Sequence, residues 1–297
     1  MKIGDYVVLE RIGYGSTSSV FKVKKGNELF AMKCINAEHI PGIKEEIKFL
    51  SFVKHPNLVP ALSMFLFSNE NSDDRFCIVF PLAQTTICNI SLSTHRNKKD
   101  QKGLSWVNIS KEQKWNWFVS LTMALLEMKN KGYFHGDIHP KNILLLNNTA
   151  MWCDFGVSCK YKPDKMYVYG SFPFCSPASF IQNGWYNDCE EAKLIEHKIE
   201  PETPFQGDIF SLGLLLSYLF SDNKRNFLQS NSRKNDLSDV RDNMWRYLLY
   251  PDVFWNCVTS SYGPKVDEII QLCCNISPNK RITLEDLVPL LQNVYIE

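Results

Sequence analysis

The most informative part of this chain is the stretch His135-Gly136-Asp137-Ile138-His139-Pro140-Lys141-Asn142, which a predicted strand, Ile143 to Leu146, follows directly. A hairpin at Asn147-Asn148 then leads to Trp152-Cys153-Asp154-Phe155-Gly156. The hairpin folds the chain back, so an aspartate, an amide and a second aspartate are expected to meet. Such groups can bind Mg²⁺ through oxygen and accept a proton. Ordinary turns and helix caps explain each residue singly, but they do not explain the set.

Upstream, two further features indicate phosphate handling. The turn Gly13-Tyr14-Gly15-Ser16-Thr17-Ser18-Ser19-Val20 joins two predicted strands, and its glycines would let backbone amides approach phosphate oxygens. A hairpin glycine pair is the plainer interpretation of that turn alone. Lys33 lies within an apolar strand and needs a counter-ion. Glu46 is favoured over Glu45 for this role, because Glu45 falls off the apolar face of the helix that carries both.

The first third of the chain alternates in the manner of β-strands. A tight hairpin at Lys25-Gly26-Asn27 and a polar turn at Ser68 to Arg75 separate some of these segments. A helical pattern opened by Pro41 and Gly42 interrupts them, with Ile43, Ile47 and Leu50 on one face. The predicted strands are Tyr6 to Ile12, Ser19 to Lys24, Glu28 to Cys34, Leu58 to Phe67 and Phe76 to Leu82.

After about residue 83 the patterns become helical. An apolar stripe from Trp117 ends at Gly132, and Asp208 to Phe220 is apolar almost all round, which is typical of a helix buried within a lobe. The sequence therefore predicts an α+β, bilobal fold: a small β-rich lobe with one helix at 1–82 and a larger helical lobe at 83–297. Two stretches, 91–111 and 182–206, are expected to be loop insertions.

Composition narrows the class of protein. The 297 residues carry a net charge of +1, so bulk charge gives no reason to expect a nucleic-acid or membrane partner. Ten cysteines show no Cys-x-x-Cys pair, and several lie in apolar runs, which is typical of free thiols in a reducing compartment. No long apolar run or leader pattern is visible, and we expect a soluble, cytoplasmic protein.

Taken together, these motifs resemble those of eukaryotic-type protein kinases over essentially the whole chain. The order continues with Gly170-Ser171, Ser176-Pro177, Asp208 to Gly213 and Ser277 to Thr283. The resemblance implies that ATP and Mg²⁺ are the cofactors, that proteins are the substrates, and that the chain phosphorylates Ser and Thr. Ser171 supports Ser/Thr over Tyr specificity, because it matches the hydroxyl that Ser/Thr kinases place beside the catalytic aspartate.

The same resemblance assigns roles to individual residues. Lys33, held by Glu46, would contact the α- and β-phosphates, and Asp137 would accept the proton of the substrate hydroxyl. Asn142 and Asp154 would hold Mg²⁺. Lys141 would stabilise charge on the transferred phosphate, unless it faces solvent. The expected nucleotide-binding residues also include Ile12, Gly13, Gly15, Val20, Ala31, Phe80, Leu82, Ala83 and Leu144.

Several positions depart from the family pattern. Gly136 replaces the usual arginine before the catalytic aspartate, and His139 replaces a lysine. Ala178 stands where the glutamate of Ala-Pro-Glu is usual, so the matching Arg281 lacks its expected partner. The candidate replacements are Glu190, Glu191 and Glu196.

Three functions remain open at this stage. The main hypothesis is an active Ser/Thr protein kinase, with a regulatory protein partner as an added expectation. The altered motifs motivate a second hypothesis, a pseudokinase that acts by binding. The catalytic stretch also resembles that of small-molecule phosphotransferases such as aminoglycoside and choline kinases, although those families generally lack the segments around Gly170 and Arg281.

Overall fold

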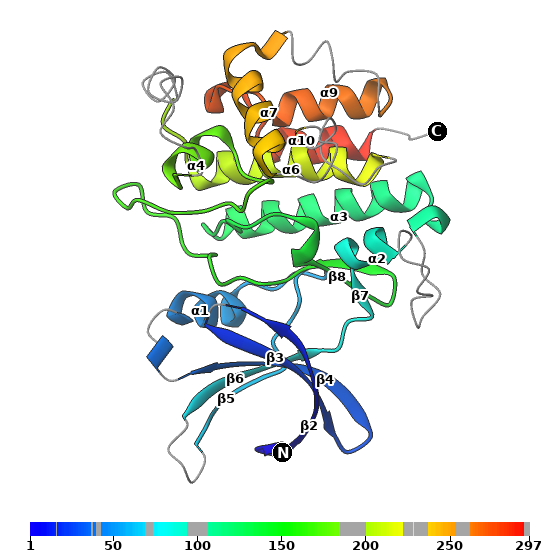
Figure 1. Ribbon diagram of the computed structural model, residues 1–297, viewed down its shortest axis with the longest axis vertical. Coiled ribbons are helices and arrows are strands. Elements are labelled where there is room, and N and C mark those ends of the chain that lie inside the picture. Colours follow the sequence, from blue (N-terminus) through cyan, green and yellow to red (C-terminus); the bar gives the residue numbers. More distant parts are fainter. Residues whose placement is uncertain are drawn as a thin grey trace.

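The computed structural model describes residues 1–15, 17–36, 38–39, 43–68, 74–93, 106–184, 200–221, 228, 237–252 and 262–293. Figure 1 shows a curved sheet with one helix at one end of the molecule, where the N-terminus lies, and a group of helices at the other. The expected α+β, bilobal arrangement is confirmed.

The small lobe is built on a six-stranded antiparallel sheet of order β1-β2-β3-β4-β6-β5. Side chains alternate across it as the pleat requires. On β4, Met32 and Cys34 are buried against Val79 of β6, whereas Ala31 and Lys33 face the other side and are half-buried. The strands are β1 Lys2–Ile3, β2 Tyr6–Tyr14, β3 Ser18–Lys25, β4 Glu28–Asn36, β5 Ser63–Phe67 and β6 Arg75–Pro81.

One predicted strand, 58–67, is wrong in its first half. Only Ser63–Phe67 forms a strand of this sheet, and the chain before it pairs instead with the larger lobe. The carbonyl of Asn57 accepts from the backbone of Trp152 at 2.8 Å, and its amide Nδ2 donates to the carbonyl of Ala150 at 2.8 Å. Pro60 has no backbone N–H, which disfavours continuation of a ladder through this point.

Helix α1 (Lys44–Phe52) lies beside the sheet and supplies the link between the lobes. Its buried residues are Glu46, Phe49 and Leu50, and the two apolar ones belong to the main core of the larger lobe. Pro41 and Gly42, expected at the start of this helix, lie outside the described residues.

The larger lobe packs its helices around α6 (Pro204–Phe220), which is buried on nearly every side. This helix begins before the expected Asp208, because Thr203 and Gln206 form a capping box at its N-terminus. The other helices are α2 Ile87–Ser93, α3 Lys111–Asn130, α4 Pro177–Gln182, α7 Leu237–Leu249, α9 Pro264–Cys273 and α10 Leu284–Gln292. A small sheet, β7 (Thr85–Thr86), β8 (Ile143–Leu146) and β9 (Thr149–Trp152), lies at the face toward the small lobe.

The two expected insertions are only partly loops. The first, 91–111, begins inside α2 and contains a short 3₁₀ helix at Trp106–Asn108, and its residues 94–105 lie outside the described part. The second, 182–206, runs from the end of α4 into α6, and its residues 185–199 lie outside the described part. Within the described ranges, every helix is too short or too polar to cross a lipid bilayer.

Candidate active site

Lys33 and Glu46 meet where β4 faces α1. Lys33 Nζ lies 2.7 Å from Oε1 and 2.9 Å from Oε2 of Glu46, and the Glu46 side chain is 2% exposed. Burial acts to lower the pKa of Lys33, but Glu46 and Asp154 outweigh it and raise the pKa, so the lysine stays charged. Glu45, the rejected alternative, pairs with Lys48 on the exposed side of the helix.

Asp154 joins this pair from the other lobe. Its Oδ1 lies 3.5 Å from Lys33 Nζ, and its side chain is 56% exposed. The backbone at Asp154 has φ of +59°, a conformation that non-glycine residues rarely adopt. Phe155 beside it is buried, with its ring 4.4 Å from that of Phe49 in α1. The buried ring therefore fixes the exposed carboxylate next to the lysine.

The catalytic stretch closes on itself through Asp137, His139 and Asn142. A 3₁₀ turn at Pro140–Asn142 returns the chain, and Asn142 Nδ2 donates to the carbonyl oxygen and to Oδ2 of Asp137, both at 2.9 Å. His139 Nε2 lies 3.3 Å from the same Oδ2. The other carboxylate oxygen, Oδ1, is buried and accepts no hydrogen bond within the described part of the chain. One oxygen of Asp137 is held by two neighbours, and the other is buried and, among the described residues, unpaired.

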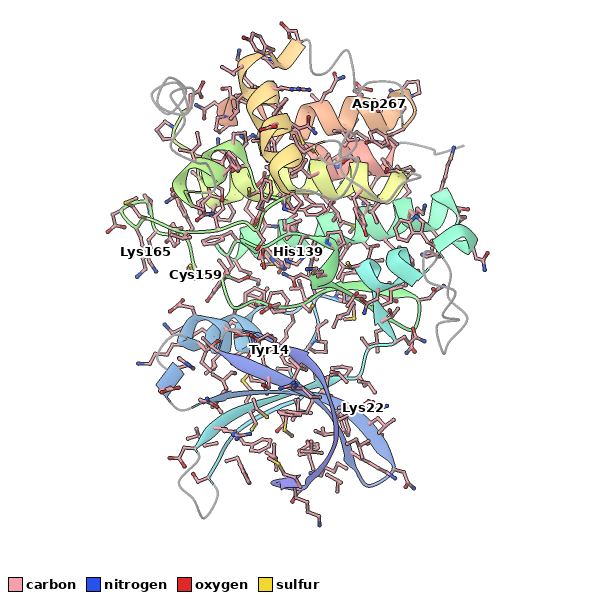
Figure 2. The ribbon with its side chains drawn as sticks, viewed as in Figure 1. Tyr14, Lys22, His139, Cys159, Lys165 and Asp267 are labelled. Carbon is pink, nitrogen blue, oxygen red and sulfur yellow. The ribbon has the colours of Figure 1, made fainter. Side chains whose placement is uncertain are left out.

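The environment keeps Asp137 ionised. Burial acts to raise its pKa, but His139, helped by the nearby hydroxyl of Ser171, lowers it to about 2. The sequence analysis noted only that His139 replaces the lysine usual in the family. It did not predict the contact between His139 and Asp137. The position of His139 two residues after Asp137 was the available signal. Figure 2 shows His139 near the middle of the molecule, on the side of the helical lobe that faces the sheet.

The expected magnesium ligands fit the chemistry of that ion. The Cys153 amide donates to the carbonyl of Asn142 at 3.0 Å. This bond holds the start of the Asp154 segment against the turn 135–142, called the catalytic turn below. Since the Nδ2 group of Asn142 is directed to Asp137, its side-chain oxygen remains for a cation, and Asp154 adds an exposed carboxylate. Two oxygen donors of this type match the preference of Mg²⁺.

Most of the expected nucleotide-binding residues lie on strands, while Gly15, Leu82 and Ala83 lie just beyond the ends of β2 and β6. Ala31 pairs with Phe80 across β4 and β6, and Val20 pairs with Lys33 across β3 and β4. Ile12 is 47% exposed. Ser18 occupies the third position of the Gly-x-Gly-x-x-Gly pattern, a departure that the sequence analysis missed. The half-buried members of the set are Gly13, Val20, Ala31, Phe80, Leu82, Ala83 and Leu144, while Gly15 is exposed.

The two remaining expected residues differ in their surroundings. Lys141 is exposed, which agrees with the alternative that it faces solvent. Ser171 is half-buried near Asp137. Ser171 follows Gly170, whose amide donates to the carbonyl of Gly136 at 2.5 Å. The segment that carries Ser171 is thereby attached to the catalytic turn.

The catalytic turn is anchored from beneath by α6. Asp208 is buried and accepts from the amides of His135 and Gly136 at 2.7 and 2.9 Å. Burial raises the pKa of Asp208 to about 7 despite these two hydrogen bonds. Burial also lowers the pKa of His135 to about 4, so its ring is neutral at physiological pH.

Gly136, the residue in place of the arginine, has φ of +78°. A Cβ atom there would lie 3.0 Å from both the Phe134 ring and Val157, so a larger residue would be strained and crowded. The space is filled by an aromatic cluster that packs the loop after Gly156. Its members are Phe134, Tyr161, Tyr167, Tyr169 and Phe205, together with Cys159.

The partner of Arg281 is Glu202, which the sequence analysis missed. Their side chains form an ion pair in which each is 1% exposed. The three carboxylates named as candidates, Glu190, Glu191 and Glu196, lie outside the described residues. Glu202 belongs to the same long connection and directly precedes the capping box of α6, which is the signal that could have identified it.

Comparison with known proteins agrees with this geometry. A family model described as "Protein kinase domain" matches residues 6–295. Mouse serine/threonine-protein kinase Nek10 is 33% identical over 52% of this chain and 15% of its own length. A probable cyclin-dependent serine/threonine-protein kinase of Dictyostelium discoideum is 26% identical over 96% of this chain and 44% of its own length.

A rice LRR receptor-like serine/threonine-protein kinase, ER2, is 25% identical over 94% of this chain and 27% of its own length. The chain thus spans less than half the length of each of these relatives. The family model, in contrast, covers nearly all of it. The chain belongs to the protein kinase domain family.

Proposed function

We propose that this chain transfers the γ-phosphoryl group of ATP to Ser and Thr hydroxyls of protein substrates. The observation that carries the proposal is the state of Asp137: ionised, with one carboxylate oxygen held by Asn142 and His139 and the other buried without a partner. A substrate hydroxyl could donate to this carboxylate, whose side chain is 18% exposed. The names of the relatives support Ser and Thr as acceptors.

In the reaction, the hydroxyl oxygen forms a bond to the γ-phosphorus as the bond to the β–γ bridging oxygen breaks. The hydroxyl proton goes to Asp137, and the products are a phosphoester and ADP. Lys33, held charged by Glu46, would bind the α- and β-phosphates. Val20, Ala31 and Leu144 would enclose the adenine.

Asn142 and Asp154 would hold Mg²⁺ through oxygen. When bound, the ion neutralises phosphate charge. Lys141 lies four residues after Asp137 and is exposed. We propose that it stabilises the negative charge of the transferred phosphoryl group.

The test is Asp137→Asn, which removes the proton acceptor and leaves the phosphate-binding groups in place. We expect turnover to fall by about 10²–10⁴-fold with Mg²⁺-ATP affinity nearly unchanged. Labelled ATP should be supplied with protein substrates in one reaction and amino-alcohols in another. Wild-type turnover by the variant, or transfer to amino-alcohols alone, would refute the proposal. Mg²⁺-ATP binding without any transfer would favour the pseudokinase instead.

The charge around the site favours substrates without upstream arginines. The hinge stretch 81–89 contains no carboxylate, and Lys141 is exposed beside the catalytic turn. Lys160, Lys162 and Lys165 are also exposed on the loop after Gly156, and Figure 2 shows Lys165 at the edge of the molecule. A peptide array dominated by arginine before the acceptor would contradict this preference.

A further inference from the structure

The Glu202 carboxylate lies at a buried meeting point of three donors. Its Oε2 pairs with Nη1 of Arg281, and its Oε1 accepts from the hydroxyls of Tyr169, at 2.7 Å, and Ser176. Tyr169 and Ser176 stand on either side of Ser171 in the chain. A single carboxylate therefore ties the Ser171 segment to a distant arginine.

Arg281 is itself fixed from several directions. Its Nε donates to the carbonyl of Asn275 at 2.7 Å, Nη1 to that of Gln206 at 2.9 Å and Nη2 to that of Ile276 at 3.2 Å. Its guanidinium also lies 5.0 Å from the centre of the Phe210 ring. These contacts fix the planar guanidinium of Arg281, so the position of any carboxylate that pairs with it is also fixed.

The backbone is shaped to admit these contacts. A Cβ atom at Gly207, in the first turn of α6, would collide with the Tyr169 ring and crowd the Glu202 carboxylate. The carbonyl of Tyr169 accepts from Ser179 Oγ and from Asn183 Nδ2, the latter at 3.1 Å. Close packing at a glycine and saturated polar groups together indicate one defined arrangement of this segment.

The network also reaches the catalytic turn. Asp208, next to Gly207 in α6, holds the amides of His135 and Gly136, and the amide of Gly170 donates back to the Gly136 carbonyl. Arg281 bonds to the same first turn of α6 through Gln206. The Ser171 segment and the Asp137 turn are thus attached to one helix end.

We propose that Glu202 is a positioning residue for the protein substrate, which supplies from a different part of the chain the buried carboxylate that Ala178 cannot supply. The proposal rests on the proposed kinase function for its catalytic consequence. Glu202 touches no reacting atom. It acts by holding the segment 169–179 in the register that places Ser171 beside Asp137.

The first experiment compares Glu202→Gln with Glu200→Gln. Glu200 is a matched control from the same segment: it is exposed and accepts from Ser277 and Asn279, both far from the Ser171 segment in the chain. For Glu202→Gln we expect kcat/KM for a peptide substrate to fall by about tenfold or more, with Mg²⁺-ATP affinity within about twofold of wild type. Glu200→Gln should change neither.

Hydrogen exchange of residues 166–180 supplies a readout that does not depend on activity. Glu202→Gln should speed exchange there by about tenfold, while exchange in β4 and α1 stays unchanged. If Glu202→Gln does not fold, Tyr169→Phe removes one donor to the carboxylate and keeps the ring, and a smaller change of the same kind is expected. Unchanged exchange and unchanged kcat/KM in the folded variants would overturn the proposal.

Rescue tests the replacement directly. Adding Ala178→Glu to Glu202→Ala should restore part of the lost kcat/KM and slow the exchange of 166–180, because a carboxylate returns to this site from the neighbouring helix. A double variant no better than Glu202→Ala overturns the assignment. If wild-type protein transfers no phosphate to any protein, the kinase proposal fails, and the exchange measurements still decide whether Glu202 holds the segment.

Discussion

Two ion pairs, Lys33–Glu46 in the small lobe and Arg281–Glu202 in the larger lobe, are both largely buried, and they differ in what surrounds them. Lys33 and Glu46 in the small lobe are 14% and 2% exposed, and Lys33 has a second carboxylate, Asp154, at 3.5 Å on its open side. Arg281 and Glu202 in the larger lobe are each 1% exposed and enclosed by backbone carbonyls and hydroxyls. A pair with an open side can act on a ligand, whereas an enclosed pair can only arrange the protein.

The largest effect should come from breaking the open pair. We expect Lys33→Met to lower kcat/KM by about 10³-fold, or ~4 kcal/mol of transition-state stabilisation, because a preorganised cation is lost from the phosphates. Lys22→Met on the neighbouring strand is a matched control, since Lys22 pairs with Glu10 at the surface. Steady-state kinetics measure kcat/KM of both variants. A loss below tenfold in Lys33→Met would contradict the proposed role of Lys33 in phosphate binding.

Breaking the enclosed pair should instead lower stability. Arg281→Lys keeps the charge but loses the fork, and we expect the free energy of unfolding to fall by about 3 kcal/mol, with Mg²⁺-ATP affinity preserved. Denaturant unfolding measures this. Lys129→Met serves as the control, because the Lys129–Glu285 pair is partly exposed and should be worth less than about 1 kcal/mol. If both variants lost the same free energy of unfolding, the enclosed pair would contribute no more to stability than the exposed one, contrary to the prediction.

Phosphorylation of the loop after Gly156 should have a smaller effect. Gly136 offers no cation to a phosphate, and Ser158, Tyr167 and Tyr169 are already buried. The loop is held by aromatic packing and by the Glu202 network, so phosphatase treatment should change kcat/KM by less than about tenfold, or ~1.4 kcal/mol. A larger loss, traced by mutation to Tyr167 or Tyr169, would show that a phosphate is the main support of the segment.

The smallest effect concerns Cys153, which reports on the open pair. The thiol is half-buried, and burial and Asp154 raise its pKa, while Lys33 acts to lower it. We expect slow alkylation near neutral pH, slowed further by ATP and by Lys33→Met. Mass spectrometry can follow it against Cys273 and Cys274, which are fully buried. Faster alkylation in Lys33→Met than in wild type would contradict the assigned electrostatics.

The features predicted well from sequence are those set by local pattern. The apolar strand around Lys33 predicted a counter-ion for this lysine, and helical spacing selected Glu46 over Glu45. The hairpin between β8 and β9 brought the Asp154 segment back to the catalytic turn. Each of these follows from a period of two or about 3.6 residues, or from one tight turn.

The features that were missed depend on tertiary contacts. Glu202 lies in a long connection with no periodic pattern, and only the folded chain brings it to Arg281. The aromatic cluster joins Phe134 to Phe205, which no local rule connects. The early start of α6 is the exception, because the pair Thr203 and Gln206 is a recognisable capping box.

The contacts of Asn57 have a mechanical consequence. They fasten the connection between α1 and β5 to the strand that precedes Asp154. If the lobes rotate about this point, displacement grows with distance from it, as along a lever. Phe155, packed on α1 close to this connection, would hardly move. Asn57, together with the Val59 amide that donates to the carbonyl of Trp152 at 3.0 Å, thus places the expected pivot of the lobes next to the Asp154 segment.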